Sequence, residues 1–282
     1  MKKKIIISGI NGFLGNRLKE FLTEEFHLYG IDINESNDLG IKVFSSKSLD
    51  KINIDPDYLI FCHAAVSSGV ISLETDLLYN VNVKLTDKIV VKFPNAKIIF
   101  ISTASIYYSN GKLIRENTID SPTNDYSISK YWAEKLVLKT KRAVIIRLSS
   151  LFGINMKENT IIPNYVNQAL NNNRIEVWGE GKRQQNYIFI DDLCLLIKKV
   201  IVNHKRVLNE VLLGVSNREY SNLDLAKIVA NETKSVVEFI NQDNSISLNY
   251  NNNKTQNLLN WSSNSDFNEE IIKYIEWKLK QS

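Results

Sequence analysis

Cysteine is scarce in this sequence, which has only Cys62 and Cys194 among its 282 residues. Both lie in apolar runs, and their separation fits neither a disulfide framework nor the spacing of metal ligands. We therefore expect two buried, unreactive thiols and no metal site.

Long hydrophobic runs and a one-sided charge are absent too. The basic start, residues 1–4, precedes only three apolar residues, 5–7, too few for a signal-peptide core or a membrane-spanning helix. We therefore expect a cytoplasmic protein with no membrane partner. The 35 basic and 31 acidic residues are scattered along the chain and leave a net charge of +4. This balance argues against a nucleic-acid partner.

Short apolar runs alternate with helical stretches through the first half of the chain, as in a parallel sheet with helices on both faces. The runs at 58–61 and 98–101 are continuously apolar, as strands buried on both sides require. The expected strands span residues 4–8, 28–33, 41–44, 58–63, 97–102, 143–148 and 211–214. Helices are expected at 12–25, in a segment ending near 92, at 126–139, from an N-cap at Asp191 or Asp192, and at 267–279.

A glycine-rich turn follows the first expected strand. Gly9, Gly12 and Gly15 allow the backbone amides at the start of the next helix to approach a pyrophosphate closely. An ordinary tight turn would also use these glycines. Asp32 ends the second strand about 20 residues later, where a carboxylate binds an adenosine ribose and repels a 2′-phosphate. Together these residues predict NAD as the cofactor, with NADP disfavoured.

The sequence thus predicts an α/β fold: a Rossmann-like, doubly wound parallel sheet with a smaller C-terminal α/β substrate-binding region. Residues 1–150 are expected to form the NAD(P)-binding domain, and residues 186–214 to return to it. From residue 151 the chain is rich in loops and asparagine turns. Residues 151–185 and 215–282 are expected to form the smaller region, above the carboxyl ends of the strands where such folds bind ligands.

Tyr126 and Lys130 lie four residues apart on an expected helix and so share one of its faces. A free tyrosine has a pKa of about 10, too high for a ready base. An adjacent ammonium stabilises the phenolate and lowers that pKa. Tyr126 could then exchange a proton with a hydroxyl or ketone oxygen. Such pairs also occur on helices by chance, so their context decides the interpretation.

Along nearly its whole length the chain resembles the extended short-chain dehydrogenase/reductases of the NAD-dependent epimerase/dehydratase branch. Residues 8–15 resemble the dinucleotide fingerprint of that family, and residues 55–65 resemble its fourth strand. Residues 101–107 are similar to the strand and loop that carry the catalytic Ser or Thr, which falls on Thr103. Further similar segments are 82–86, 147–153, 178–181, 187–192 and 258–261.

The resemblance implies a catalytic triad of Thr103, Tyr126 and Lys130, with Lys130 also reaching the nicotinamide ribose. The implied cofactor-binding residues are Gly9, Asn11, Gly12, Phe13, Leu14, Gly15, Asp32, Ala64, Ala65, Asn82 and Lys130. The implied substrate-binding residues are Thr103, Tyr126, Ser150, Trp178, Arg183, Gln185 and Tyr187. Loop aromatics such as Trp178 and Tyr187 could instead pack against a domain face. His63 is expected to be packed and hydrogen-bonded rather than catalytic.

Two departures from the family concern the diphosphate of a nucleotide-sugar. Gln185 and Asn186 stand where nucleotide-sugar binders often carry an Arg and an Asp, and that Arg clamps the diphosphate. Lys182 and Arg183, just upstream, could supply the positive charge instead. Ser150 stands where many epimerases have Asn, so the substrate pocket is divergent.

Another departure concerns the reaction. The 4,6-dehydratases of the family place an acidic pair directly after the catalytic Thr, whereas this chain has Ala104 and Ser105. General acid and base groups contribute roughly 10²–10⁴-fold to such a step, so no dehydration is expected.

The expected function is an NAD-dependent epimerase that acts on a nucleotide-activated sugar by transient oxidation at carbon 4, with Tyr126 as the acid and base. An alternative is an NAD(P)H-dependent reductase of a 4-keto-6-deoxy-sugar nucleotide. A third is a non-catalytic, dinucleotide-binding regulatory protein. The resemblance also implies a role in cell-surface polysaccharide biosynthesis, and a homodimer through the helix of Tyr126 and the helix before Pro94. The nucleotide base, the sugar and the product stereochemistry stay open.

Overall fold

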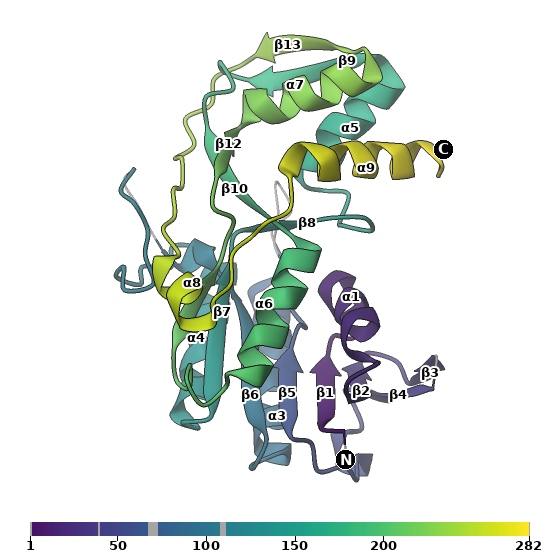
Figure 1. Cartoon of the computed structure of the whole chain (residues 1–282), viewed down its shortest axis with the longest axis vertical. Coiled ribbons are helices and arrows are strands. Elements are labelled where there is room, and N and C mark those ends of the chain that lie inside the picture. Colours follow the sequence, from purple (N-terminus) through teal and green to yellow (C-terminus); the bar gives the residue numbers. More distant parts are fainter. Residues whose placement is uncertain (1, 39, 67–72, 108–110, 282) are drawn as a thin grey trace.

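The computed structural model describes residues 2–38, 40–66, 73–107 and 111–281. A large twisted sheet forms one end of the molecule, and a smaller α/β layer lies beyond the ends of its strands (Figure 1). The large sheet has the strand order β11-β7-β6-β5-β1-β2-β4-β3. The bounds are β1 Lys4–Ser8, β2 His27–Asp32, β3 Ser36–Asp38, β4 Ile41–Ser45, β5 Tyr58–Phe61, β6 Lys97–Thr103, β7 Ala143–Leu148 and β11 Val211–Gly214.

Neighbouring strands of this sheet are parallel, except that the edge strand β3 runs antiparallel to β4. Strand β1 lies between β2 and β5. The chain therefore leaves β1 in one direction and returns on its other side, which creates a switch point at the carboxyl ends of β1 and β5. Such a switch point is where open α/β sheets bind ligands.

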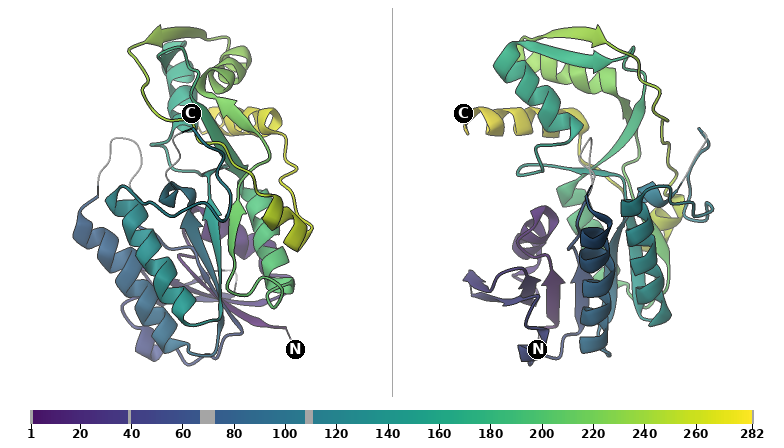
Figure 2. Two further views of the ribbon diagram at one scale, coloured as in Figure 1. Left: turned by 90° about the vertical axis from the view of Figure 1, so that its left-hand side faces the viewer. Right: turned by 180° about the vertical axis from the view of Figure 1, so that it is seen from behind.

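Helices cover both faces of the sheet (Figure 2). Because successive side chains of a strand point to opposite faces, Ile5 and Ile7 pack with helices α1 and α6, whereas Ile6 packs with α3 and α4. The helices on the two faces are α1 Phe13–Leu22, α6 Ile190–Val202, α3 Leu85–Lys92 and α4 Asp125–Lys139. Shorter pieces are a 3₁₀ turn at Leu49–Lys51, α2 Thr75–Leu78, a π-helical segment at Tyr79–Lys84 and a 3₁₀ turn at Ala104–Ile106.

The smaller layer has its own hydrophobic core, to which Val166, Val177 and Ile271 belong. It combines a three-stranded sheet with a separate parallel pair, β9 and β13. Its elements are β8 Ser150–Phe152, β9 Arg174–Trp178, β10 Gln184–Phe189, β12 Glu219–Ser221, β13 Val236–Ile240, α5 Ile161–Asn172, α7 Asn222–Thr233 and α9 Phe267–Leu279. The predicted α/β fold with a doubly wound, Rossmann-like sheet is confirmed.

Helix α8 (Asn253–Leu259) belongs by sequence to the range expected for the smaller region, yet it packs beside the large sheet. Thr255 accepts a hydrogen bond from the backbone N–H of Leu213 in β11 at 2.9 Å. Trp261, just after α8, is buried in the same core as α1 and α6 and donates to the carbonyl of Asp192. The C-terminal segment therefore packs against both layers. The division of the chain into two domains stays a prediction.

The expected capping role of Asp191 and Asp192 is wrong. The N-cap of α6 is Phe189, and both carboxylates lie in the first turn of the helix, where they favour its positive end. Arg17 of α1 donates to both oxygens of Asp191, at 2.6 and 2.7 Å. Asp192 accepts hydrogen bonds from Ser263 and from the backbone after it. These carboxylates hold α1 and the C-terminal segment against α6.

Candidate active site

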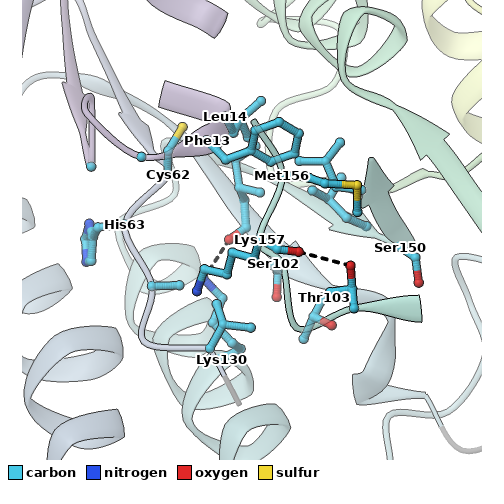
Figure 3. Close-up of a pocket in the computed structure, with 18 of the residues that line it drawn as sticks. Phe13, Leu14, Cys62, His63, Ser102, Thr103, Lys130, Ser150, Met156 and Lys157 are labelled. Carbon is cyan, nitrogen blue, oxygen red and sulfur yellow. Dashed lines mark hydrogen bonds between the residues drawn. The ribbon is translucent and has the colours of Figure 1, made fainter. Parts of the chain in front are cut away.

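A cavity of about 980 Å³ lies at the carboxyl ends of β1, β5 and β6, between the two layers. It runs from Asp32, at the end of β2, to Tyr187 of β10. Figure 3 shows Thr103, Lys130 and Ser150 around this space, with Phe13 and Leu14 across from them. The cavity follows from the strand order, because the switch point opens beneath the smaller layer.

The glycine-rich turn forms one wall of this cavity. Gly9 has φ +74°, and a Cβ atom there would lie 2.7 Å from the backbone of His63; one on Gly15 would lie 2.1 Å from the carbonyl oxygen of Gly9. Close backbone packing therefore requires both glycines. Gly12 is the N-cap of α1, whose described N-terminus has no side-chain cap and no acidic residue in its first turn. Its first amides suit a diphosphate, since Gly12, Phe13 and Leu14 line the cavity.

Asp32 lies where a ribose would reach it. One carboxylate oxygen accepts from the backbone N–H of Asn11 at 2.9 Å, and the other from that of Ile33 at 2.8 Å. These bonds fix the orientation of the carboxylate, which lines the cavity. Each oxygen keeps a lone pair for a ribose hydroxyl. Asn11 thus acts here through Asp32, and Gly15 through the packing of the turn; neither lines the cavity.

Asn82 holds the loop after β5 in place from behind. Its side chain accepts from the N–H of Ala65 at 2.8 Å and donates to the Ala65 carbonyl at 3.0 Å and to Ser129 of α4 at 2.9 Å. Ala64 lines the cavity, whereas Ala65 and the buried Asn82 do not. The structure therefore gives these two predicted cofactor residues a positioning role.

The three predicted catalytic residues meet at one end of the cavity. Thr103 ends β6, and Tyr126 and Lys130 project from α4, whose start is fixed by a reciprocal capping box between Asn124 and Ser127. Tyr126 and Thr103 share a side-chain hydrogen bond. Lys130 donates to the carbonyl of Ile101 at 2.7 Å. The structure thus brings the predicted triad together.

The electrostatics of this triad differ from the expectation. Burial raises the pKa of Tyr126 to about 12, and the hydrogen bond from Thr103 offsets only part of that rise. Burial also lowers the pKa of Lys130 to about 8, against the charge of Glu134. The ammonium is directed at Ile101 and lies 4.3 Å from the ring centroid of Phe100. Loss of hydration therefore outweighs the expected effect of Lys130 on the phenol.

His63 lines the cavity, but both of its ring nitrogens have partners. Thr86 donates its hydroxyl proton to the Asn82 carbonyl at 2.8 Å, so it accepts from Nε2 of His63 at 3.2 Å. Ser8 then donates to Nδ1 at 2.7 Å. Burial lowers the pKa of His63 to about 3. A neutral imidazole with a hydrogen bond at each ring nitrogen fits the expectation that His63 is a packed residue and not a catalytic one.

The two cysteines are unreactive by environment. Cys194 is fully buried in the core, as expected, whereas Cys62 lines the cavity and is only partly buried, so the expected burial of Cys62 is wrong. Burial raises the pKa of Cys62 to about 12 and that of Cys194 further still. Among the described residues there is no cluster of three or more side chains able to hold a metal ion.

The predicted substrate residues divide into two groups. Ser150, Arg183, Gln185 and Tyr187 line the cavity, the last three from one face of β10 and the residue before it. Tyr187 also stacks on Phe267 of α9, with ring centroids 5.0 Å apart. Trp178 ends β9, 55% exposed, and lines neither of the cavities formed by the described residues. The structure therefore does not bring Trp178 to the site.

Sequence reasoning missed a segment that runs from the loop after β8 into the first turn of α5 and lines the cavity. Its members are Met156, Lys157, Asn159, Thr160, Ile161 and Ile162. The only signal was position, because this loop follows a strand that ends at the site. A smaller cavity beside Thr103 also involves Ile246, Leu248 and Tyr250, from a polar stretch that carried no signal.

Residues 5–214 match the NAD dependent epimerase/dehydratase family. The chain belongs to this family. It is therefore an NAD-dependent enzyme of the extended short-chain dehydrogenase/reductase type, with the fold that the structure shows. None of the described helices is long and apolar enough to cross a membrane.

Similar proteins carry several activities. The chain is 28% identical over 275 residues to dTDP-D-glucose 4,6-dehydratase from Dictyostelium discoideum. The match covers 81% of this chain but only 62% of that protein. It is 28% identical over 220 residues to GDP-6-deoxy-D-talose 4-dehydrogenase from Aggregatibacter actinomycetemcomitans, covering 74% of this chain and 73% of that one. The structure of UDP-glucuronic acid 4-epimerase from Bacillus cereus with NAD superposes with a TM-score of 0.86 at 18% identity, covering 98% and 99% of the chains.

Proposed function

We propose that the protein is an epimerase that inverts carbon 4 of a nucleotide-activated sugar. The observation that carries the proposal is the junction of Thr103, Tyr126 and Lys130 at one end of a cavity whose other end has the glycine turn and Asp32. A cavity of about 980 Å³ has room for a dinucleotide beside an extended second ligand. Relatives include proteins named as 4-epimerases of UDP-glucuronate and of a glycolipid diphosphate sugar.

In such a reaction some residues of the site bind the cofactor and others move the proton. The amides of Gly12 and the start of α1 bind the diphosphate of the cofactor, and Asp32 binds its adenosine ribose. The chemistry that NAD supplies when bound is the reversible removal of a hydride from carbon 4. Tyr126 takes the proton of the hydroxyl at that carbon and later returns it, while Thr103 donates to the same oxygen. Lys130 binds the nicotinamide ribose from α4.

Dehydration is not part of the proposal, although one relative is named as a dehydratase. Ala104 is buried, and the Ser105 hydroxyl shares a hydrogen bond of 2.8 Å with Thr103. Neither side chain carries the carboxyl group that elimination of water needs. The second candidate is a reductase of a 4-keto-6-deoxy-sugar nucleotide, favoured by the relative named as a 4-dehydrogenase of a 6-deoxy sugar.

The test of the proposal is Tyr126→Phe. We expect turnover of nucleotide-sugars with NAD to fall roughly 10²–10⁴-fold, because the variant lacks the oxygen that moves the proton. The matched control is Tyr131→Phe, five residues along the same helix and outside both cavities, which should keep full activity. Product isomers detected by chromatography or NMR separate an epimerase from a reductase. Activity of Tyr126→Phe within a few fold of wild type would refute the mechanism.

We further propose that the protein is a cytoplasmic homodimer that pairs through α4 and the helical segment before Pro94. Apolar side chains are exposed along these helices: Trp132 is 52% exposed, Val91 71% and Ile128 46%. Trp132 lies against Tyr79, with ring centroids 5.4 Å apart. An exposed aromatic pair flanked by aliphatic side chains is typical of an interface between subunits.

A further inference from the structure

A second cavity of about 170 Å³ lies beside the catalytic end of the first. We call it the side cavity. It shares one wall with the main cavity: Thr103, Leu148, Ser149, Ser150, Arg183 and Gln185 line both. Its far wall is formed by Ile246, Leu248 and Tyr250, from the extended segment between β13 and α8. One wall of the side cavity is therefore formed by a part of the chain distant in sequence from the catalytic residues.

Arg183 is the only charged side chain among the described residues that line the side cavity. Its Nε atom is buried and has no hydrogen-bond partner in the described structure. Asp32 is the only described carboxylate on the wall of the main cavity, at its opposite end. A buried cationic donor without an acceptor is unfavourable, so a ligand that supplies an anionic oxygen there gains a strong, charge-assisted hydrogen bond.

The position of the side cavity indicates which part of a sugar enters it. Under the proposed function, the oxygen on carbon 4 lies against the hydroxyls of Thr103 and Tyr126. Ser105, bonded to Thr103 at 2.8 Å, lines only the side cavity. Carbon 4 of a pyranose is bonded to carbons 3 and 5. Carbon 3 carries a hydroxyl directly on the ring, whereas carbon 5 carries the exocyclic carbon 6, which reaches farther out. The group that fits the side cavity is therefore the one on carbon 6.

We propose that the side cavity binds a carboxylate at carbon 6, with Arg183 as its counter-charge, so that the substrate is a nucleotide-activated uronic acid. This inference rests on the proposed function. The hydroxyls of Ser105 and Ser150 lie on the same walls and can donate to the second carboxylate oxygen. The apolar wall of Leu248 and Tyr250 limits access of water, which strengthens the charge pair.

Other groups on carbon 6 fit less well. A methyl group, as in a 6-deoxy sugar, leaves the Nε atom of Arg183 unpaired, so the inference also disfavours the 4-keto-6-deoxy-sugar reductase. A hydroxymethyl group offers one acceptor but no charge. The diphosphate of the substrate is the competing anion, because Arg183 lines the main cavity as well and lies two residues from Gln185 on the same face of the chain.

Calorimetric titration of the full-length, NAD-loaded protein distinguishes the two anions. The probes are two pairs that differ at carbon 6, UDP-glucuronate with UDP-glucose and GDP-mannuronate with GDP-mannose, together with UDP and GDP alone. We expect the wild type to bind the uronate of one pair on the order of 10- to 100-fold more tightly than its neutral partner. Arg183→Gln should abolish that preference while changing the affinity for the neutral sugar less than about threefold.

The matched control is Lys182→Gln, since Lys182 is 81% exposed, pairs with Glu180 and lines neither cavity. It should keep the preference. Circular dichroism and NAD affinity verify that each variant is folded. An equal loss for both sugars and for the free nucleotide would assign Arg183 to the diphosphate and overturn the inference. Epimerisation of a neutral sugar without any preference for a uronate would overturn it too, yet leave the proposed function standing. If no nucleotide-sugar bound, both would fail.

Discussion

Replacement of Lys130 by Met should remove activity and yet leave the NAD-free protein at least as stable as the wild type at pH 7. Lys130 is 2% exposed, and burial lowers its pKa from 10.5 to about 8. A shift of that size corresponds to about 3 kcal/mol of unfavourable free energy while the ammonium stays charged. The hydrogen bond to Ile101 is lost in the variant, and an unpaired carbonyl costs about 1–3 kcal/mol. The net gain is therefore about 0–2 kcal/mol.

The pH dependence is the sharper test of Lys130, because the lost hydrogen bond contributes equally at each pH. Between pH 8 and 10.5 the folded protein has released the proton of Lys130 while the unfolded chain still holds it. Stability rises with pH wherever the unfolded state binds more protons. The free energy of unfolding of the wild type, minus that of Lys130→Met, should therefore increase by about 2–3 kcal/mol from pH 7 to pH 10.

Urea denaturation of the NAD-free proteins at pH 7, 8, 9 and 10 measures this difference. The matched control is Lys139→Met, in the last turn of the same helix and exposed. Its difference from wild type should stay within about 0.5 kcal/mol at each pH. A wild-type advantage over Lys130→Met that stays constant or falls as the pH rises would refute the reasoning that Lys130 is a desolvated cation.

Three further predictions concern binding, stability and assembly. Asp32→Ala should raise the dissociation constant of NAD about tenfold in calorimetry and leave that of NADP unchanged or lower; equal losses would remove the ribose assignment. Glu134→Ala should lower the free energy of unfolding by about 3 kcal/mol, because it removes two of the three described carboxylate hydrogen bonds of the buried Arg147 guanidinium; a loss below about 1 kcal/mol in urea denaturation would contradict this. Trp132→Glu should sediment as a monomer, whereas an intact dimer would locate the interface elsewhere.

The large sheet could be predicted from the sequence because its strands are buried on both faces. Residues 5–7 and 98–101 are continuously apolar for that reason, and the expected strand at 4–8 coincides with β1. The caps were less predictable. Asp191 and Asp192 have the right residue type and position for an N-cap, but Arg17 and the segment at 263–265 compete for their oxygens. Partners that distant leave no local signature.

The same reason separates the two halves of the site. The cofactor half comes from short contiguous stretches, since the turn at 8–15 and Asp32 meet across adjacent parallel strands. The half proposed to bind the sugar combines Thr103, Arg183 and Tyr250, which lie far apart in the sequence, and Tyr250 joins the other two only through the return of the chain after β13. A polar loop such as 241–252 gives no indication of the wall that it will form. Trp178 illustrates the opposite error. It lies in a segment that resembles one of the family, but the fold leaves its side chain exposed and outside the cavity.

Thr103, Tyr126 and Lys130 show what the spacing of residues along a sequence cannot predict, namely the pKa values of the groups in the site. Spacing places Tyr126 and Lys130 on one face of α4, but the balance between charge and desolvation depends on packing. In this structure burial holds the phenol near pKa 12, and the ammonium is engaged with the Ile101 carbonyl rather than with Tyr126. With a pKa near 12, the phenol is a poor base at neutral pH. Under the proposed mechanism, we expect the bound cofactor and sugar to change the field around Tyr126, so that proton transfer takes place only when both are bound.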